Sequence, residues 1–494
     1  MRRGVIIVSV MALFIIQAVI RFRSDINHDA AWYLYVADGL LHGKQLYTDF
    51  LEVNPPLGMW LTVPIVWLGS LTGLGSINAN FGVLLALTVL TLLLVNRYLR
   101  LMRDVPDTAR ALLCVFIAAA ILFMPALDFT EREHLMVLLF LPWPFLRLAR
   151  LRGIRLGAVE SVLVGAMAAA AIAIKPQSFL APLGVELVLL LRYRNFHAVF
   201  AVENIAALVF VAFYGAVIAV FAPDFLGFMV DLGVKAYVPF MSYPNATIWL
   251  FSIRSILLVV FALLLWQRSD GPMADVTALL AAAAAGFILS YFIQYKGFSY
   301  QILPARIFAA MACAAAVSGI VARTPFVNWP SATKRLVGAS AFVVAVDFGF
   351  QPQTYPNNDK FFDVAIARYA PDSRSIYIAS TRVSHGFPFA LNRDLVWASR
   401  LSAQWLAPYV ASKWQGGTLP QDDIVARALD WTVSDLVTFR PDIVFIDESK
   451  EQFYVLGGHF DYEKFWSNDP RFATLWAGYE RRASMNGFAV YTER

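Results

Sequence analysis

Long apolar runs, separated by short polar segments, fill the first 350 residues of the chain. A helix needs roughly 20 apolar residues to cross a bilayer. By that measure the pattern predicts about eleven membrane-spanning helices, at 4–20, 79–97, 111–126, 135–149, 157–174, 179–192, 198–221, 247–266, 274–293, 302–321 and 336–350. We therefore expect a polytopic α-helical membrane domain over residues 1–350.

Basic residues set the predicted orientation of these helices. They gather in alternate connections, which the positive-inside rule places in the cytoplasm together with Met1. The run 57–74 is also apolar, but counting it as a span would reverse the orientation of every later helix. We therefore predict that it is a helix lying on the outer surface of the membrane. The first outer loop then covers residues 21–78.

The pattern changes after about residue 350. Polar residues return, and the apolar runs shorten to strand length at 375–380, 442–447 and 487–492, with helical stretches between them. Such a mixture predicts a small α/β domain over 351–494, on the periplasmic side. The first run, 4–20, has no small-residue cleavage site after it, so we expect an uncleaved membrane helix there.

Composition supports a membrane location and excludes several classes of function. The chain is 59% hydrophobic and 15% charged, whereas a soluble domain has about 25% charged residues. We expect a multi-pass protein of a bacterial inner membrane. The net charge of +5 comes from basic residues at helix ends, so it requires no nucleic-acid partner. Cys114 and Cys313 lie in apolar runs, which excludes a disulfide framework and a cysteine-based metal site.

The first outer loop has an unusual concentration of polar and aromatic side chains: Asp25, His28, Asp29, Tyr33 and Glu52. Ionisable groups at a membrane boundary are costly to hold in place, which favours a functional role. A carboxylate here could act as a general base that removes a proton from an attacking hydroxyl. The structural alternative is that Asp29 only caps the helix predicted over 29–42.

Four consecutive ionisable residues, Glu131, Arg132, Glu133 and His134, separate two apolar runs at the predicted outer end of a helix. They would either form a salt-bridged turn or face the same cavity as the first loop, where they could orient an acceptor or hold a cation. One histidine beside one glutamate is too small a set to predict a zinc site. No resident metal is therefore predicted.

Cationic side chains also occur at predicted outer helix ends. Lys175 and Lys296 end apolar runs, and Tyr300 and Arg306 follow Lys296 closely. Such cations could bind the phosphate of a lipid at the outer interface. The alternative is that each lysine simply extends toward water from a helix end.

The order of these features resembles the GT-C glycosyltransferase superfamily, in the style of protein O-mannosyltransferases and the lipid A aminoarabinose transferase. The resemblance covers about 350 membrane residues. It rests on the acidic first loop, an acidic turn before the fourth helix and a C-terminal outer domain, together with the motifs Gly43-x-x-x-Tyr47-x-Asp49 and Asn54-Pro55-Pro56-Leu57. The family often has Asp-Glu where this chain has His28-Asp29, so Asp29 and Asp25 both remain candidates for the base.

This resemblance implies a transfer reaction on the periplasmic face. The donor would be a sugar linked to a polyprenyl phosphate, and the acceptor a hydroxyl of a glycan, a glycolipid or a protein. Asp29 or Asp25 would act as base in a single inverting step. Lys175, Lys296 or Arg306 would stabilise the departing lipid phosphate. No cofactor is required; a divalent cation could take part but is not needed.

Two other classes of function compete with a transferase. A transporter or flippase of lipid-linked glycans should have related halves and charges at mid-membrane, but the chain has no repeat and a single mid-span Glu186, which we expect to face the bundle. A non-catalytic membrane assembly subunit would explain the C-terminal domain but not the acidic loops. The sequence also has no Walker loop and no Gly-x-Ser-x-Gly elbow, so no nucleotide site or hydrolase nucleophile is predicted.

Overall fold

The structure is a computed structural model that describes residues 3–349, 352–353, 360–455 and 458–494. Its residues fall into two compact units. The helical unit comprises Met1–Ser24, Thr72–Val217 and Tyr243–Tyr355, and the sheet unit comprises Asp25–Leu71, Ile218–Ser242 and Pro356–Arg494. The first outer loop thus belongs to the same unit as the C-terminal residues. Met1 and the predicted domain boundary at 350/351 lie outside the described residues.

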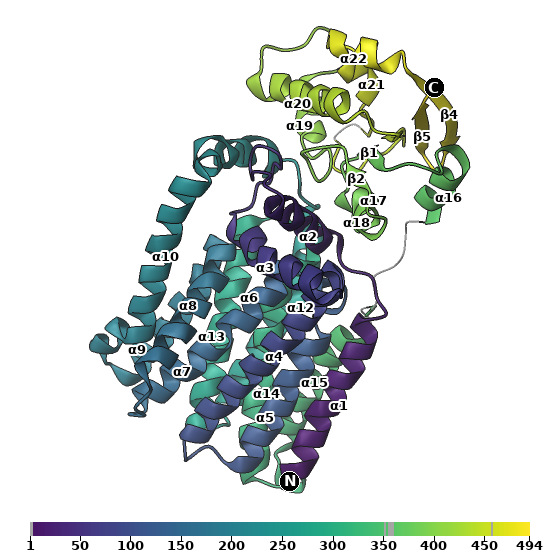
Figure 1. The fold of residues 1–494 in the computed structure, drawn as a ribbon. Helices are drawn as coiled ribbons and strands as arrows, with labels where there is room; N and C mark the ends of the chain where they lie inside the picture. The colour runs from purple at the N-terminus through teal and green to yellow at the C-terminus, as the bar shows by residue number, and fades with distance from the viewer. Residues whose placement is uncertain (1–2, 350–351, 354–359, 456–457) are drawn as a thin grey trace. The chain divides into compact units, whose positions relative to one another are not determined.

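The helical unit contains a helix at every predicted span (Figure 1). Its helices are α1 (Arg3–Arg21), α4 (Ser76–Leu101), α5 (Asp107–Phe123), α6 (Arg132–Phe140), α7 (Pro142–Leu151), α8 (Ala158–Ile174), α9 (Leu180–Tyr193), α10 (Val202–Phe221), α12 (Asn245–Trp266), α13 (Pro272–Gln294), α14 (Leu303–Arg323) and α15 (Ser331–Gly349). Short 3-10 turns include η2 (Pro176–Phe179) and η6 (Ser299–Ile302).

Six of the described helical stretches are long and apolar enough to cross a membrane. One of these stretches, Arg132–Leu151, joins α6 and α7. Pro142 and Pro144 divide it, because proline lacks the N–H that a continuous helix would use. The predicted fold class, a polytopic helical membrane protein with a small C-terminal sheet domain, is confirmed. The number of spans and their orientation stay predictions.

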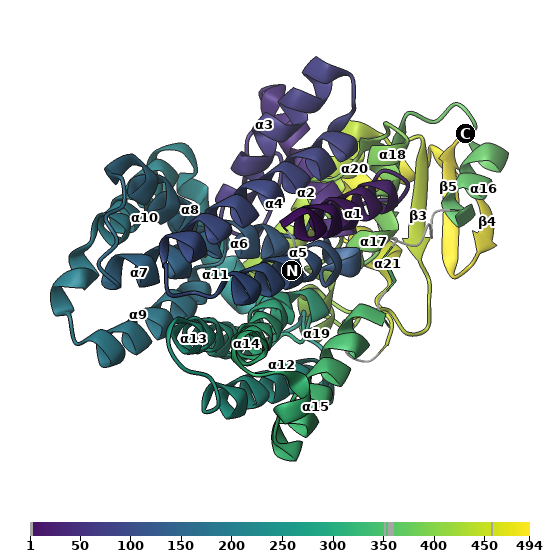
Figure 2. The same ribbon diagram turned by 90° about the horizontal axis from the view of Figure 1, so that it is seen from below.

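Helix α14 lies at the centre of the helical unit. Most of its side chains are buried, and it packs against α5, α12 and α13. Figure 2 shows α12, α13 and α14 side by side. Small residues allow close approach elsewhere in the bundle: a Cβ on Gly286 of α13 would lie 2.4 Å from the backbone oxygen of Leu180 at the start of α9. Close backbone contact of this kind is typical of membrane helix pairs.

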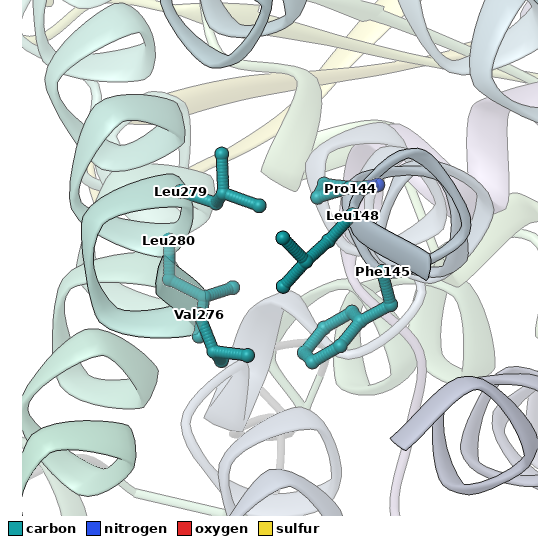
Figure 3. Close-up of a pocket in the computed structure, with 6 residues that line it drawn as sticks. All are labelled: Pro144, Phe145, Leu148, Val276, Leu279 and Leu280. Atoms are coloured by element: carbon teal, nitrogen blue, oxygen red, sulfur yellow. The ribbon is translucent and has the colours of Figure 1, made fainter. Parts of the chain in front are cut away.

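A purely apolar seam joins α7 and α13 (Figure 3). The gap between the two helices has no room for a water molecule. Six side chains line it: Pro144, Phe145, Leu148, Val276, Leu279 and Leu280. We assign this seam to helix packing rather than to ligand binding, because it offers neither polar groups nor space.

The sheet unit contains a five-stranded sheet in the order β2-β1-β3-β5-β4. Its strands are β1 (Ser375–Ala379), β2 (Val396–Trp397), β3 (Ile443–Asp447), β4 (Tyr479–Met485) and β5 (Phe488–Glu493). Strands β1, β2 and β3 are parallel, whereas β5 and β4 run antiparallel to their neighbours. Three of these strands match the predicted runs, and β2 and β4 were not predicted.

Helices cover both faces of the sheet. They are α16 (Lys360–Tyr369), α17 (Val383–Gly386), α18 (Phe389–Asn392), α19 (Ala407–Lys413), α20 (Asp423–Phe439), α21 (Tyr462–Trp466) and α22 (Pro470–Trp476). Helix α16 packs on one face, where Phe362 contacts Phe445 of β3. Trp466 of α21 packs on the other face against Tyr377 of β1.

The remaining segments of the sheet unit come from the first outer loop and from residues 218–242. The loop forms α2 (His28–Leu41) and nearly all of α3 (Leu57–Thr72), and the second segment forms η4 (Phe225–Met229), α11 (Val230–Leu232) and η5 (Gly233–Tyr237). Both predicted loop helices are therefore present. Helix α2 ends where predicted, because Gly43 has a φ of +87° that suits glycine after a helix end.

Candidate functional site

The candidate residues of the helical unit meet at the start of α6. Glu131, Arg132, Glu133 and His134 are all buried, at 9% exposure or less. Lys175, at the end of α8, donates a hydrogen bond to Oε1 of Glu133, and its Nζ lies 5.3 Å from the centre of the Tyr300 ring. Residues predicted at two separate helix ends thus form one group, which we call the Glu133 cluster: Glu131, Arg132, Glu133 and Lys175.

The second carboxylate oxygen of Glu133, Oε2, is the unsatisfied polar atom of this cluster that bears on ligand binding. Oε2 is buried and has no hydrogen-bond partner among the residues that the structure describes. A buried carboxylate oxygen without a partner loses its hydration with no compensation. The Glu133 cluster therefore has capacity to accept one more hydrogen bond.

His134 has a different role from its three neighbours. Its Nδ1 contacts the carbonyl oxygen of Phe129, and its Nε2 lies 2.9 Å from the carbonyl oxygen of Ile121. The Phe129 and His134 rings are also in contact, with centroids 4.7 Å apart. Because both ring nitrogens are engaged by backbone, the geometry describes a histidine that joins α5 to α6.

Two further candidate cations, Lys296 and Arg306, precede and follow Tyr300 in the sequence. Lys296 follows the end of α13, and its backbone oxygen accepts a hydrogen bond from the N–H of Tyr243 at 2.8 Å. Lys296 is 8% exposed and Arg306, in the second turn of α14, is 1% exposed. Both side chains are buried, so the structure does not support the alternative in which Lys296 simply extends from a helix end into water.

The start of α2 carries the candidate base. Asn27, not Asp29, is the N-cap, because its side chain accepts a hydrogen bond from the Asp29 N–H at 2.9 Å. Asp29 lies in the first turn, where the helix dipole favours a negative charge. Its Oδ1 lies 3.6 Å from Nε2 of His28. Asp29 is therefore not the N-cap of this helix, and the explanation of Asp29 as a cap is wrong.

Asp25 accepts hydrogen bonds with both of its carboxylate oxygens. Its Oδ1 accepts a hydrogen bond from the Ile26 N–H at 2.8 Å, and its Oδ2 accepts one from Nδ2 of Asn392 at 2.9 Å. Asn392 ends α18, so Asp25 ties the beginning of the first loop to the C-terminal part of the sheet unit. A carboxylate with both oxygens already engaged is a poorer candidate for accepting a proton from a substrate.

Glu52 organises the inside of the first loop. It accepts hydrogen bonds from Nε1 of Trp32 at 3.0 Å and from Nδ2 of Asn54 at 2.5 Å. Tyr47 adds a bond from its hydroxyl to the Asn54 carbonyl at 2.9 Å. These contacts join α2 to the turn before Pro55, so they indicate a structural role for Glu52. Tyr33 is buried within the same unit, at 6% exposure.

Aromatic and backbone contacts attach this loop to the C-terminal residues of the sheet unit. Phe387 packs against Trp32 and Tyr35, and the Trp397 N–H donates to the Tyr35 hydroxyl at 2.9 Å. The Leu51 N–H donates to the Arg400 carbonyl at 2.8 Å. Nothing in the sequence pattern indicated this association, because the partners are more than 300 residues apart.

A second buried ionic group in the helical unit explains Glu186. Arg147 is fully buried and pairs with Glu186 at 2.5 Å and with Glu203 at 2.8 Å, while Arg150 also pairs with Glu203 at 2.8 Å. We call these four residues the Arg147 cluster. Arg147 thus lies inside the bundle, where its ion pairs hold α7, α9 and α10 together.

The sequence-predicted residues are thus divided between the two units. The helical unit holds Glu131, Glu133, His134, Lys175, Lys296, Tyr300 and Arg306, and the sheet unit holds Asp25, His28, Asp29, Tyr33 and Glu52. Among the residues that the structure describes, no three His, Cys, Asp or Glu side chains gather in a way that could hold a metal ion.

No protein-family model and no curated protein sequence matches the chain. Solved structures do resemble it. ArnT from Cupriavidus metallidurans, in a crystal structure bound to undecaprenyl phosphate, superimposes with a TM-score of 0.58 and 13% identity, over 99% of this chain and 98% of that one. The arabinofuranosyltransferase AftD from Mycobacteria gives a TM-score of 0.49 and 14% identity, over 100% of this chain and 40% of that chain. The likeness to ArnT extends over nearly the whole of both chains and shows that the two share a fold, as the resemblance in the sequence implies.

Proposed function

We propose that this protein is an integral-membrane glycosyltransferase that takes a sugar from a polyprenyl-phosphate donor. The observation that carries the proposal is the full-length likeness in fold to ArnT, whose crystal structure has undecaprenyl phosphate bound. The acidic first loop and the buried cations are the residue types that such a reaction needs. The reaction would take place on the periplasmic face of a bacterial inner membrane, with a hydroxyl of a glycan, glycolipid or protein as acceptor.

Asp29 is our candidate for the general base. It would take the proton of the acceptor hydroxyl as that oxygen forms a bond to the anomeric carbon. The bond between the anomeric carbon and the phosphate oxygen would break in the same step, and its electron pair would leave with the phosphate. Attack from the side opposite to the leaving group inverts the configuration. Asp29 is preferred over Asp25 because the Asp25 oxygens are engaged by Ile26 and Asn392.

The departing phosphate needs positive charge nearby, since negative charge develops on it as the bond breaks. Lys296 and Arg306 are our first candidates, with the Tyr300 hydroxyl as a further donor. Lys175 is paired with Glu133, so it would add its charge together with that carboxylate. A lipid monophosphate leaves with less charge than a diphosphate, and for this reason the mechanism does not require a divalent cation.

The decisive experiment compares Asp29→Asn with the unchanged protein and with Asp38→Asn. Asp38 is a matched control because it is an exposed carboxylate on the same helix, paired only with His42. We expect Asp29→Asn to lower sugar transfer from an undecaprenyl-phosphate donor by about 10²–10⁴-fold, since a positioned base contributes that much. Binding of undecaprenyl phosphate should not change, because the base does not hold the lipid.

Two outcomes would revise the proposal. If Asp25→Asn abolishes transfer while Asp29→Asn does not, Asp25 is the base. If the unchanged protein neither binds undecaprenyl phosphate nor transfers a sugar from it, the chain is not a transferase of this class.

A further inference from the structure

The parallel strands of the sheet unit end at an edge that the proposed mechanism does not use. The chain leaves β1 toward β2 on one side, whereas β3, on the other side of β1, leads on toward β5 and β4. In open α/β sheets, ligands bind outside the carboxyl ends of strands at such a reversal. Here the reversal lies between β1 and β3. The side chains at the carboxyl ends of these strands are Asp447 and those directly after Ala379.

Most polar side chains at this edge are satisfied within the protein. The Ser380 hydroxyl lies 2.7 Å from Nδ1 of His385 and 3.5 Å from Oδ2 of Asp447. The other oxygen of Asp447 accepts a hydrogen bond from the Ser449 N–H at 3.0 Å. These three side chains therefore form one hydrogen-bonded group at the carboxyl ends of β1 and β3.

Arg382 differs from these neighbours. It is exposed, and its guanidinium carbon lies 4.8 Å from the centre of the Phe453 ring, which follows β3. Over the described ranges, no carboxylate forms an ion pair or hydrogen bond with this guanidinium. An aromatic face orients an arginine without neutralising it. This edge therefore presents an exposed cation that is oriented by Phe453 and has no carboxylate partner among the described residues.

The same segment lies against the helix that carries the candidate base. Helix α17, which begins one residue after Arg382, packs on α2, and Phe387 just beyond it contacts Trp32. The charge of Arg382 reaches the first turn of α2: burial lowers the pKa of His28, Asp29 raises it and Arg382 lowers it. Arg382 and the His28-Asp29 pair therefore belong to one electrostatic environment.

We propose that Arg382 binds an anionic group, a phosphate or a carboxylate, on the acceptor that Asp29 deprotonates. This inference rests on the proposed function and adds a specificity residue from the C-terminal part of the chain. In an inverting transfer the base and the leaving group lie on opposite sides of the anomeric carbon. A cation beside Asp29 is therefore on the acceptor side, away from the departing lipid phosphate. The planar guanidinium can form two parallel hydrogen bonds to either anion.

The test uses the full-length protein with Arg382→Gln, Arg382→Lys and a matched control, Arg368→Gln. Arg368 is also exposed and stacks over a ring, that of Tyr369 at 5.4 Å, but lies on α16. The first probe is inorganic phosphate at constant ionic strength, with the thermal unfolding midpoint as the readout. Phosphate should raise the midpoint of the unchanged protein and of Arg368→Gln. It should raise that of Arg382→Gln less, with Arg382→Lys between them.

The second readout is transfer kinetics with an undecaprenyl-phosphate sugar donor and a cell-envelope extract as acceptor. Arg382→Gln should raise the apparent KM for the extract by about 10- to 100-fold, the loss expected for charge-assisted hydrogen bonds. The donor KM and kcat should stay within about twofold. The extract is then divided into an anionic and a neutral fraction. The rise in the apparent acceptor KM of Arg382→Gln should appear with the anionic fraction and not with the neutral one.

Several results would overturn the inference without touching the proposed function. An unchanged phosphate effect in Arg382→Gln would show that this guanidinium binds no anion. A rise in the donor KM instead of the acceptor KM would place Arg382 at the lipid phosphate. The reverse result is also distinguishable. If the unchanged protein transfers no sugar, but phosphate raises its unfolding midpoint and does not raise that of Arg382→Gln, then the transferase proposal is refuted and the anion site stands.

Discussion

Two groups of charged side chains are buried in the helical unit, and they differ in how completely their hydrogen bonds are made. In the Arg147 cluster all four carboxylate oxygens of Glu186 and Glu203 accept hydrogen bonds from arginine. In the Glu133 cluster Lys175 bonds to one oxygen of Glu133, and Oε2 has no partner among the described residues. The sequence alone does not separate the two groups, because ionisable residues within or beside apolar runs suggest function by default.

The difference separates a structural ionic group from a candidate site. A buried network with every bond made holds helices in one arrangement. A buried carboxylate with an open oxygen retains a cost that a ligand could relieve. We therefore attribute the Arg147 cluster to the packing of the bundle and propose that the Glu133 cluster lies in the substrate region. Three substitutions test this assignment.

The largest expected effect is on the Arg147 cluster. Arg147→Met would leave Glu186 buried without its cationic partner and Glu203 with only Arg150. Removing one partner of a buried ion pair typically costs about 3–5 kcal/mol, so the folded protein should be strongly depleted. The measurements are the yield of monodisperse protein and the thermal unfolding midpoint.

A charge-balanced variant serves as the control for that prediction. Arg147→Met combined with Glu186→Gln removes one charge of each sign and should recover part of the lost stability. If Arg147→Met alone unfolds no more easily than the unchanged protein, the cluster does not hold the bundle together.

The next effect concerns activity rather than folding. Glu133→Gln combined with Lys175→Met removes a buried pair together and leaves neither charge unpaired, so the protein should fold. Transfer from an undecaprenyl-phosphate sugar should fall by about 100-fold, the usual loss when a charged or hydrogen-bonding group is removed from a transition-state site. Retention of activity within about threefold would move the Glu133 cluster to the structural class.

Much of the fold could be predicted from the sequence because its signals are local. Apolar runs of sufficient length placed every helix of the bundle. Strand-length runs placed β1, β3 and β5. Strand β4 was missed even though Asn486-Gly487 lies between two pairing strands with both residues at positive φ, a strong hairpin signal. Strand β2 has only two residues, too few for any periodicity.

The candidate site was predictable only in part, because its bonds join distant segments. The sequence placed Glu133, Lys175 and Tyr300 at helix ends on one predicted side, and the structure brings these three together. It could not show that Arg147 reaches Glu186, because no periodicity connects residues 39 positions apart. Arg382 also gave no signal, because a lone arginine in a polar stretch is ordinary; only the structure places it directly before the helix α17 that packs on α2.

The smallest effect comes from the helix packing that supports the Arg147 cluster. A Cβ on Gly165 of α8 would lie 2.1 Å from the backbone oxygen of Glu203, so Gly165→Ala must displace α10 or α8. Overpacking of this kind costs about 1–3 kcal/mol, measured as a lower thermal unfolding midpoint. Gly82→Ala is the matched control, because a Cβ there meets nothing within 4 Å.

The cost at Gly165 should also depend on the ionic cluster, since the glycine positions the residue that pairs with Arg147 and Arg150. In a Glu203→Gln background those charge-assisted bonds are already weakened, so adding Gly165→Ala should cost less than it does alone. Neighbouring residues that share a network are coupled in this way by about 0.5–3 kcal/mol. If the stability losses of the two substitutions simply add, Gly165 serves only the packing of the backbones. It would then play no part in completing the hydrogen bonds that distinguish the Arg147 cluster from the Glu133 cluster.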